Sequence, residues 1–361
     1  MNKVLLATTA LVTAALVVPA AAQEQPVKLG VGGKLRHFFF VSDQDEIGTE
    51  RLNASGMSTD AEVYFSGETT LDSGLRVRGV IELEAESRND RNADEAYIDF
   101  RDTWGRIRIG EKEGWNSSFI GDPIPEAFLT TDERIIGEMA IRTRNGVTNT
   151  DAYTFKRFAS DSLSLQYQTP EVNGFQAGIA YHPTVADTEG VFDAATARNN
   201  SIDVSGRWQG EVARGVRARI GGGYINIASR KTATGNDGLE AFNVNATVTS
   251  GAVTVGGTYM DVNPDNGTDE ENVGIGVLWR GYPWSFSADY NLGKRDATPN
   301  PLTREKTEVV KLQTAYKVGP GIDVGLVGFY TQQRTGRATA AAAPAVEFDG
   351  VGATVGAKLD F

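Results

Sequence analysis

Basic residues with alternating spacing are the first candidates for chemistry in this sequence. Three pairs of them are each separated by one position: Lys34 with Arg36, Arg76 with Arg78, and Arg106 with Arg108. Residues two apart on a strand share a face, so each pair would present its charge in one direction. The segment 113–161 instead carries acids, among them Glu113, Asp122, Glu126, Asp132, Glu133 and Glu138. Opposed charges of this kind select ions and orient dipolar solutes.

The remaining composition excludes most other chemistry. The chain has no Cys and two His, so it has no thiol nucleophile, disulfide or Cys-ligated zinc. His182 could nominally partner a Ser or Asp, but no motif points to it, and we expect no enzyme activity. A net charge of −12 argues against nucleic acid as a partner.

One acidic segment, 261–271, invites a calcium interpretation, because hard cations take clustered oxygen ligands. It fails as a helix–loop–helix calcium site, since Gly267 falls at the seventh position and Asn272 at the twelfth. We expect no cofactor. A looser Ca²⁺ or Mg²⁺ site at external loops, with Asp43, Asp45 and Glu46, is the alternative.

Strands with one polar face must position the charged pairs. From Gly350 to Phe361 apolar and polar or small residues alternate strictly, and the same period of two recurs along the chain. About sixteen such segments are predicted, each near the ~10 residues that a tilted barrel strand needs to cross a bilayer. Their ranges are 27–41, 58–71, 75–87, 93–102, 105–112, 162–169, 174–182, 200–209, 215–228, 239–250, 251–263, 270–280, 283–294, 305–318, 321–333 and 347–361.

Short and long connections alternate between these strands. Tight turns such as Asp72-Ser73-Gly74 and Gly319-Pro320 are followed by longer polar stretches, of which 113–161 is the longest. Aromatic residues, including Tyr64, Tyr97 and Trp284, lie mostly near the predicted strand ends. The pattern predicts an all-β fold, a transmembrane antiparallel β-barrel with short periplasmic turns and long external loops.

The first residues predict export. Lys3, an apolar run from Val4 to Val18 and the small residues after Pro19 are typical of a cleaved secretory signal over 1–22. Residues 23–361 then form one barrel domain.

Several segments resemble Gram-negative outer-membrane general porins, particularly the alphaproteobacterial type. They are 27–36, 95–100, 104–111, 167–175 and 354–361. The last, with Gly356, Leu359 and Phe361, is similar to that family's assembly signal. The resemblance implies sixteen strands, a homotrimer, and a long third external loop, here 113–161, folded into the lumen.

This resemblance suggests where a pore would be narrowest. The acids Asp122, Glu126, Asp132 and Glu133 of the loop would face a basic wall of Lys34, Arg36, Arg76, Arg78, Arg106 and Arg108, with a transverse field between them. Alternatively, the acids form a solvated loop face and the arginines pair locally with Glu82, Glu84 and Glu111.

The function expected is passive diffusion of ions and small hydrophilic solutes through a water-filled pore in the bacterial outer membrane. The acidic excess suggests a mild cation preference, and lipid and lipopolysaccharide are the expected surroundings. A solute-specific channel of the same architecture and a structural or adhesive barrel are the alternatives. The former would show a ladder of binding residues, which is not evident in the sequence.

Overall fold

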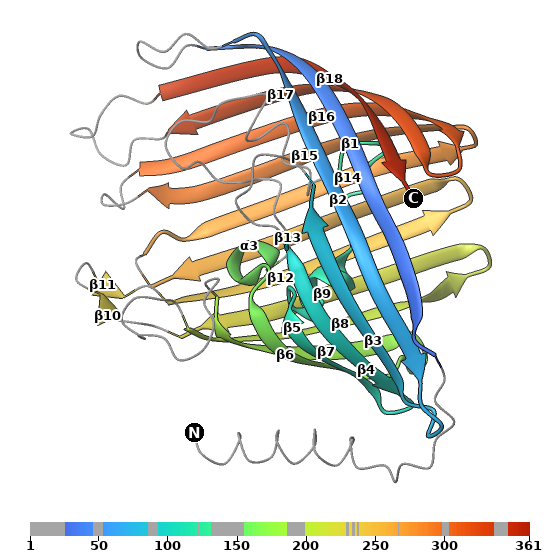
Figure 1. The fold of residues 1–361 in the computed structure, drawn as a ribbon. Helices are drawn as coiled ribbons and strands as arrows, with labels where there is room; N and C mark the ends of the chain where they lie inside the picture. The colour runs from blue at the N-terminus through green and yellow to red at the C-terminus, as the bar shows by residue number, and fades with distance from the viewer. Residues whose placement is uncertain are drawn as a thin grey trace.

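The computed structural model describes residues 26–45, 53–85, 93–121, 123–130, 155–185, 199–228, 231–232, 235–236, 238–265, 267–297, 303–335 and 346–361. Within these residues, sixteen antiparallel strands close into one barrel, with β1 paired to both β2 and β18 (Figure 1). The strands are β1 (Lys28–Gln44), β2 (Ser55–Thr70), β3 (Arg76–Glu84), β4 (Glu95–Asp102), β5 (Gly105–Glu111), β6 (Leu163–Gln168), β7 (Phe175–Thr184), β8 (Asn199–Ala213), β9 (Val216–Ile227), β12 (Leu239–Ser250), β13 (Val253–Pro264), β14 (Glu270–Gly281), β15 (Trp284–Ala297), β16 (Thr303–Gly319), β17 (Ile322–Thr335) and β18 (Val346–Asp360).

The sixteen-stranded barrel predicted from the sequence is therefore confirmed. Predicted and observed strands correspond one to one, and the largest difference is at β8, which continues to Ala213 instead of ending near 209. It is longer because Glu211 still pairs with Arg217 of β9 across the ladder. In lipid this closure leaves no strand edge with unpaired backbone groups.

Four short elements were not predicted. They are the helices α2 (Trp115–Ile120) and α3 (Lys156–Ala159) and the strands β10 (Lys231–Thr232) and β11 (Gly235–Asn236), which pair only with each other. Among the described residues, no helix is long and apolar enough to cross a membrane.

The two faces of the wall differ in polarity. Ile275, Leu312 and Leu326 point outward and are 50–62% exposed, as expected for side chains that meet lipid. Residues one position away, such as Lys311 and Gln313, point inward. Trp279, Trp284, Phe286 and Tyr316 form an outward aromatic cluster, with 4.9 Å between the Trp284 and Tyr316 rings. Tyr64 and Tyr97 do not join such a belt, because they share the inward parity of Glu62 and Asp99.

The connections alternate in length as predicted. Seven short ones lie at one rim: 71–75, 103–104, 169–174, 214–215, 251–252, 282–283 and 320–321. The strand ends that the long connections join lie at the other rim. In a barrel of this kind the rim of short turns faces the periplasm.

Candidate functional site: an inner loop and a charged wall

Residues 113–121 and 123–130, which follow β5 and are called the segment 113–130 below, pack against inward-facing side chains of the barrel. Helix α2 lies on β7, β8 and β9, where Trp115 and Phe119 are buried. Asn116 exchanges hydrogen bonds of 3.0 and 3.1 Å with Asn243 of β12. The chain then continues past β13 and β14 to β17 and β18.

Glycines on five strands allow this segment to approach the wall. A Cβ at Gly178 would lie 2.6 Å from Trp115, and one at Gly276 would lie 2.7 Å from Ile124. Gly223 under Asn116, Gly256 under Pro123 and Gly325 under Phe128 are equally tight. Separations this short would force the neighbouring atoms to move. The glycines sit 20 to 50 residues apart, and the sequence does not reveal their common role because that role depends on the loop that covers them.

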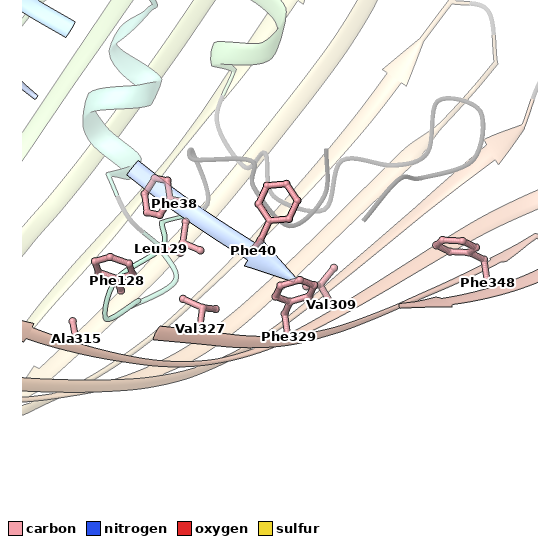
Figure 2. Close-up of a cluster of buried hydrophobic side chains, with 9 residues drawn as sticks. All are labelled: Phe38, Phe40, Phe128, Leu129, Val309, Ala315, Val327, Phe329 and Phe348. Carbon is pink, nitrogen blue, oxygen red and sulfur yellow. The ribbon is translucent and has the colours of Figure 1, made fainter. Parts of the chain in front are cut away.

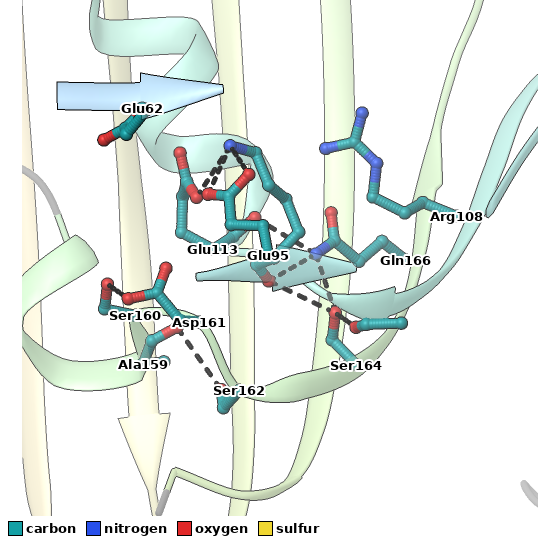
Figure 3. A network of polar contacts seen from close by, with 12 residues as sticks. Glu62, Glu95, Arg108, Glu113, Ala159, Ser160, Asp161, Ser162, Ser164 and Gln166 are labelled. Carbon is teal, nitrogen blue, oxygen red and sulfur yellow. Dashed lines mark hydrogen bonds and ion pairs between the residues drawn. The ribbon is translucent and has the colours of Figure 1, made fainter. Parts of the chain in front are cut away.

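Polar side chains of β4 and β6 hold the start of the segment (Figure 3). Lys112 Nζ lies 2.5 Å from the carboxylate of Glu95 and 3.1 Å from Glu113. Gln166 Nε2 donates to the backbone carbonyls of Lys112 and Glu113 at 3.0 and 3.1 Å. Burial lowers the pKa of Lys112, but the carboxylates of Glu113 and Glu95 raise it more, so the ammonium keeps its proton.

A buried ion pair holds the middle of the segment. Lys311 Nζ of β16 lies 2.5 Å from Glu126 Oε1 and 3.5 Å from Asp289 Oδ2, and the side chains of both acids are fully buried. Gln313 Oε1 accepts hydrogen bonds from the backbone N–H groups of Phe128 and Leu129, at 3.2 and 2.8 Å.

An apolar cluster and a lysine hold its end. Phe128 meets Phe38 of β1 edge to face with ring centroids 5.9 Å apart, and Leu129 completes the cluster in Figure 2. Lys358 of β18 donates to the carbonyl of Phe128 and lies over the same ring, 5.0 Å from its centroid. These tethers were not recognisable in the sequence, since Lys311, Gln313 and Lys358 occupy ordinary inward positions of their strands.

The expectation for Glu126 needs correction. It was predicted to face the basic wall across the pore, but its side chain is buried against β16 because Lys311 requires a counter-charge there. Asp122, Asp132 and Glu133, together with Glu138, lie outside the described residues, so their placement stays a prediction.

The predicted basic residues all lie on the inward face, but they differ in how closely acids and aromatic rings contact them. Lys34 lies 2.6 Å from Glu62, and Arg36 lies 3.5 Å from Asp60. Pairing of the basic residues with acids on neighbouring strands was the alternative expected from the sequence. Such pairing occurs here, but the acids are not the ones expected.

Arg108 is fixed by contacts with neighbouring side chains and does not project freely into the pore. Its guanidinium donates to both oxygens of Asp99 at 2.7 and 3.1 Å, and it lies between the rings of Tyr97 and Trp115, at 4.2 and 4.6 Å. Because only 5% of the residue is exposed, it contributes to holding α2 on the wall. Arg106 lies beside it, 5.2 Å from Trp115.

Charge on the wall of β2 to β5 changes sign along the strands. Near the external rim, cross-strand partners are acidic: Glu62 opposes Glu84, and Glu82 opposes Glu95. Near the periplasmic rim, Arg76 opposes Arg101, and Arg101 opposes Arg106. The wall therefore carries an axial gradient of charge, which the paired basic residues alone did not reveal.

A second set of inward arginines lies farther round the same side of the wall, on β8 and β9. Arg219 of β9 donates to the carbonyls of Ser118 and Phe119 at the end of α2. Arg207 of β8 lies 3.4 Å from Glu171 and 5.5 Å from the Phe119 ring. Asp289, an inward-facing acid of β15, lies beside Lys311 and not beside these arginines.

The other predicted sites are placed as follows. Gly356 lies opposite Phe38 and a Cβ there would collide with that ring, whereas Leu359 and Phe361 point outward and are 36% and 65% exposed. Asp45 accepts a hydrogen bond of 2.8 Å from Asp349 N–H, and Glu46 lies outside the described residues, so the calcium alternative stays a prediction. The carboxylates of Glu62, Glu84 and Asp94 come within 4.8 Å of one another, as do those of Asp94, Glu95 and Asp161, so among the described residues both groups have the donor set of a metal site.

His182 does have a serine partner. Ser162 Oγ lies 2.8 Å from His182 Nδ1, but both residues are buried, with at most 1% exposed, and the pair leaves no access for a substrate. Ser162, which directly precedes β6, also contacts the backbone carbonyl of Ala159 in α3 at 3.3 Å, so the pair connects this part of the chain to β7.

A family model for Gram-negative porins matches residues 7–338. The chain belongs to this family. It is accordingly an outer-membrane β-barrel that forms a porin channel, and family and fold indicate a channel in preference to an enzyme. The match does not distinguish the alphaproteobacterial type. Comparison with curated protein sequences finds no match.

Solved structures show the same fold at low sequence identity. OmpT of Vibrio cholerae has a TM-score of 0.62 and 14% identity, covering 95% of this chain and 100% of that one. An anion-selective porin from Comamonas acidovorans has a TM-score of 0.61 and 15% identity, covering 93% and 100%. OmpF of Salmonella typhi, in complex with daunomycin, has a TM-score of 0.61 and 13% identity, covering 93% and 98%.

Proposed function

We propose that this porin is a general diffusion channel for ions and small hydrophilic solutes. The observation that carries the proposal is the anchored segment 113–130, which covers the inner wall from β7 to β18 and is held by charges, amides and aromatic rings at its start, middle and end. A segment held this firmly narrows the lumen without closing and opening, as a passive filter requires.

The narrowest part of the pore would lie between this loop and the wall of β1 to β5. Lys34 and Arg36 face Asp60 and Glu62 there, so the wall has both signs of charge close together. Mixed charge of this kind favours hydrated, polar solutes over apolar ones and has no need of one specific ligand. Asp122, Asp132 and Glu133 would add negative charge from the loop side.

We also propose a homotrimer embedded in lipid and lipopolysaccharide. The support is the outward apolar band, together with the neighbouring OmpT structure of Vibrio cholerae, which is described as a trimer form and shares 15% identity at a TM-score of 0.60.

Single-channel conductance of the refolded protein in a planar bilayer tests the proposal. A general porin gives large ohmic steps, grouped in threes if three pores insert together. Block of the current by one solute at low concentration would favour the solute-specific alternative. Insertion without any current would contradict the channel proposal and favour the structural barrel.

A further inference from the structure

Three arginines form a row at the periplasmic rim of the inner wall. Arg76, Arg101 and Arg106 are consecutive cross-strand partners on β3, β4 and β5. Directly opposed side chains in an antiparallel sheet are ~5 Å apart at Cβ, where like charges repel. The positive charge of such a row has to be balanced by acidic side chains or by a bound anion.

The acids of the barrel compensate the row only weakly. Arg76 lies 3.9 Å from Glu68, and Arg106 lies 3.7 Å from Asp99, beyond hydrogen-bond distance in both cases. Asp99 is engaged by Arg108 at 2.7 Å. Arg101, which is exposed to the lumen, has no ion pair with any residue that the structure describes.

A pocket lies beside this row. It has a volume of about 360 Å³ and is lined by Arg101, Arg106 and Arg207 together with Gln168 and Gln176. The turn residues 169–171, between these two glutamines, and Asp102 and Gly105 complete the lining. The Nε donors of Arg106 and Arg207 are buried and meet no acceptor within the described part of the chain. The site thus has unused hydrogen-bond donors as well as positive charge.

Two acids also line the pocket, but each has another contact. Glu171 lies 3.4 Å from Arg207 and accepts a hydrogen bond from Gln209 at 3.0 Å, and Asp102 accepts the N–H of Thr103 at 2.6 Å. Three guanidinium groups therefore face two carboxylates, with Arg76 adjacent.

We propose that this pocket binds a small doubly charged oxyanion, such as hydrogen phosphate, at the periplasmic mouth of the channel. The guanidinium fork matches the geometry of phosphate and carboxylate oxygens and supplies paired N–H donors. A dianion also relieves the repulsion within the arginine row, which chloride does less well. The position of the pocket at the exit of a pore rests on the proposed channel function.

Arg101→Gln is the decisive variant, because Arg101 is exposed and its removal breaks no ion pair among the described residues. Arg217→Gln is the matched control: Arg217 is exposed on the inward parity of β9 at the same rim and loses the same charge, but it does not line the pocket. Binding of inorganic phosphate to the detergent-folded barrel is followed by phosphorus NMR line broadening at constant ionic strength.

Saturable broadening is expected for the wild type and for Arg217→Gln. Arg101→Gln should weaken the apparent affinity about tenfold, as for loss of one charge-assisted hydrogen bond. Absence of binding by the wild type overturns the proposal. Equal weakening in both variants also overturns it, since it indicates only diffuse attraction to the rim.

Planar-bilayer current distinguishes the site from the channel function. A barrel that binds phosphate but passes no current leaves the site intact and contradicts the diffusion channel. A barrel that conducts but shows no difference between the two variants in phosphate binding contradicts the site and leaves the channel standing.

Discussion

The ion pair between Glu126 and Lys311 joins two parts of the chain that are far apart in sequence, inside the barrel. Both side chains are almost completely shielded from solvent, at 0% and 3% exposure. In such surroundings a charge without its partner is costly, because neither water nor another group replaces the lost contact. The pair therefore fixes where the loop lies more than it adds to overall stability.

Glu126→Gln should lower the free energy of unfolding of the detergent-folded barrel by about 3 kcal/mol, because Lys311 loses its nearest carboxylate partner, and Asp289 lies 1 Å farther away. Denaturant titration measures this. Glu347→Gln is the control, since its pair with Arg334 is half exposed and solvent screens the attraction, so the free energy of unfolding should change little. Similar losses in the two variants would show that the buried pair does not matter.

Phe361, a residue of the expected assembly signal, allows folding and assembly in the cell to be tested separately. Its backbone N–H and C=O bond with Gly33 at 3.1 and 2.9 Å, and these bonds survive Phe361→Ala, while 65% of the residue is exposed. We expect unchanged stability after refolding but several-fold less assembled barrel in cells. Val351→Ala, another exposed apolar position of β18, is the control in membrane fractionation. A reduced yield in both variants would argue against a terminal signal.

Among the secondary-structure elements, helix α2 depends on the glycines beneath it. Its six residues are too few for stability on their own. Trp115 and Phe119 give it stability by packing against the barrel, and Gly178 leaves room for the Trp115 ring. The wall and the loop are therefore complementary in shape.

Gly178→Val should displace Trp115 and raise the hydrogen-exchange rate of the amides of residues 115–129 by at least about tenfold, as expected for a local contact loss above 1.4 kcal/mol. Mass spectrometry of exchanged peptides gives the measurement. Gly328→Val is the control, because a Cβ at Gly328 meets no atom within 4 Å. Protection that is unchanged in Gly178→Val would show that the helix does not rely on this glycine.

Strands and loop packing differ in how far the sequence reveals them. The period of two and the turn residues are local signals, so all sixteen strands were predictable, and β12 was predicted at its observed bounds. The position of the loop was not, because Gly178, Gly256 and Lys311 acquire their roles only when strands remote in sequence form one wall. Arg108 was predicted as basic and inward, but its burial depends on Trp115, which arrives from the loop.

For the whole molecule, charge should determine the sign of ion selectivity. The chain carries 47 acidic and 35 basic residues, and its inner wall is acidic toward the external rim at Glu62, Glu84 and Glu95. Cations entering from outside meet this negative potential first.

We therefore expect a reversal potential of the sign that corresponds to mild cation preference, measured in a bilayer under a potassium chloride gradient. The preference should shrink as the mean salt concentration rises toward 1 M, where the Debye length falls to ~3 Å. A reversal potential of the opposite sign would contradict this prediction and indicate that the arginine row dominates ion selectivity.

The pairing of β1 with β18 has a consequence for how the protein is made. The pairing that closes the barrel places Lys34 opposite Asp360. β1 can therefore complete its pairing only after β18, the last strand of the barrel, has been synthesised. Until then two edges would be left with unpaired backbone groups, which the hydrocarbon interior does not tolerate. We therefore expect closure of β1 against β18 to coincide with entry of these strands into the hydrocarbon interior.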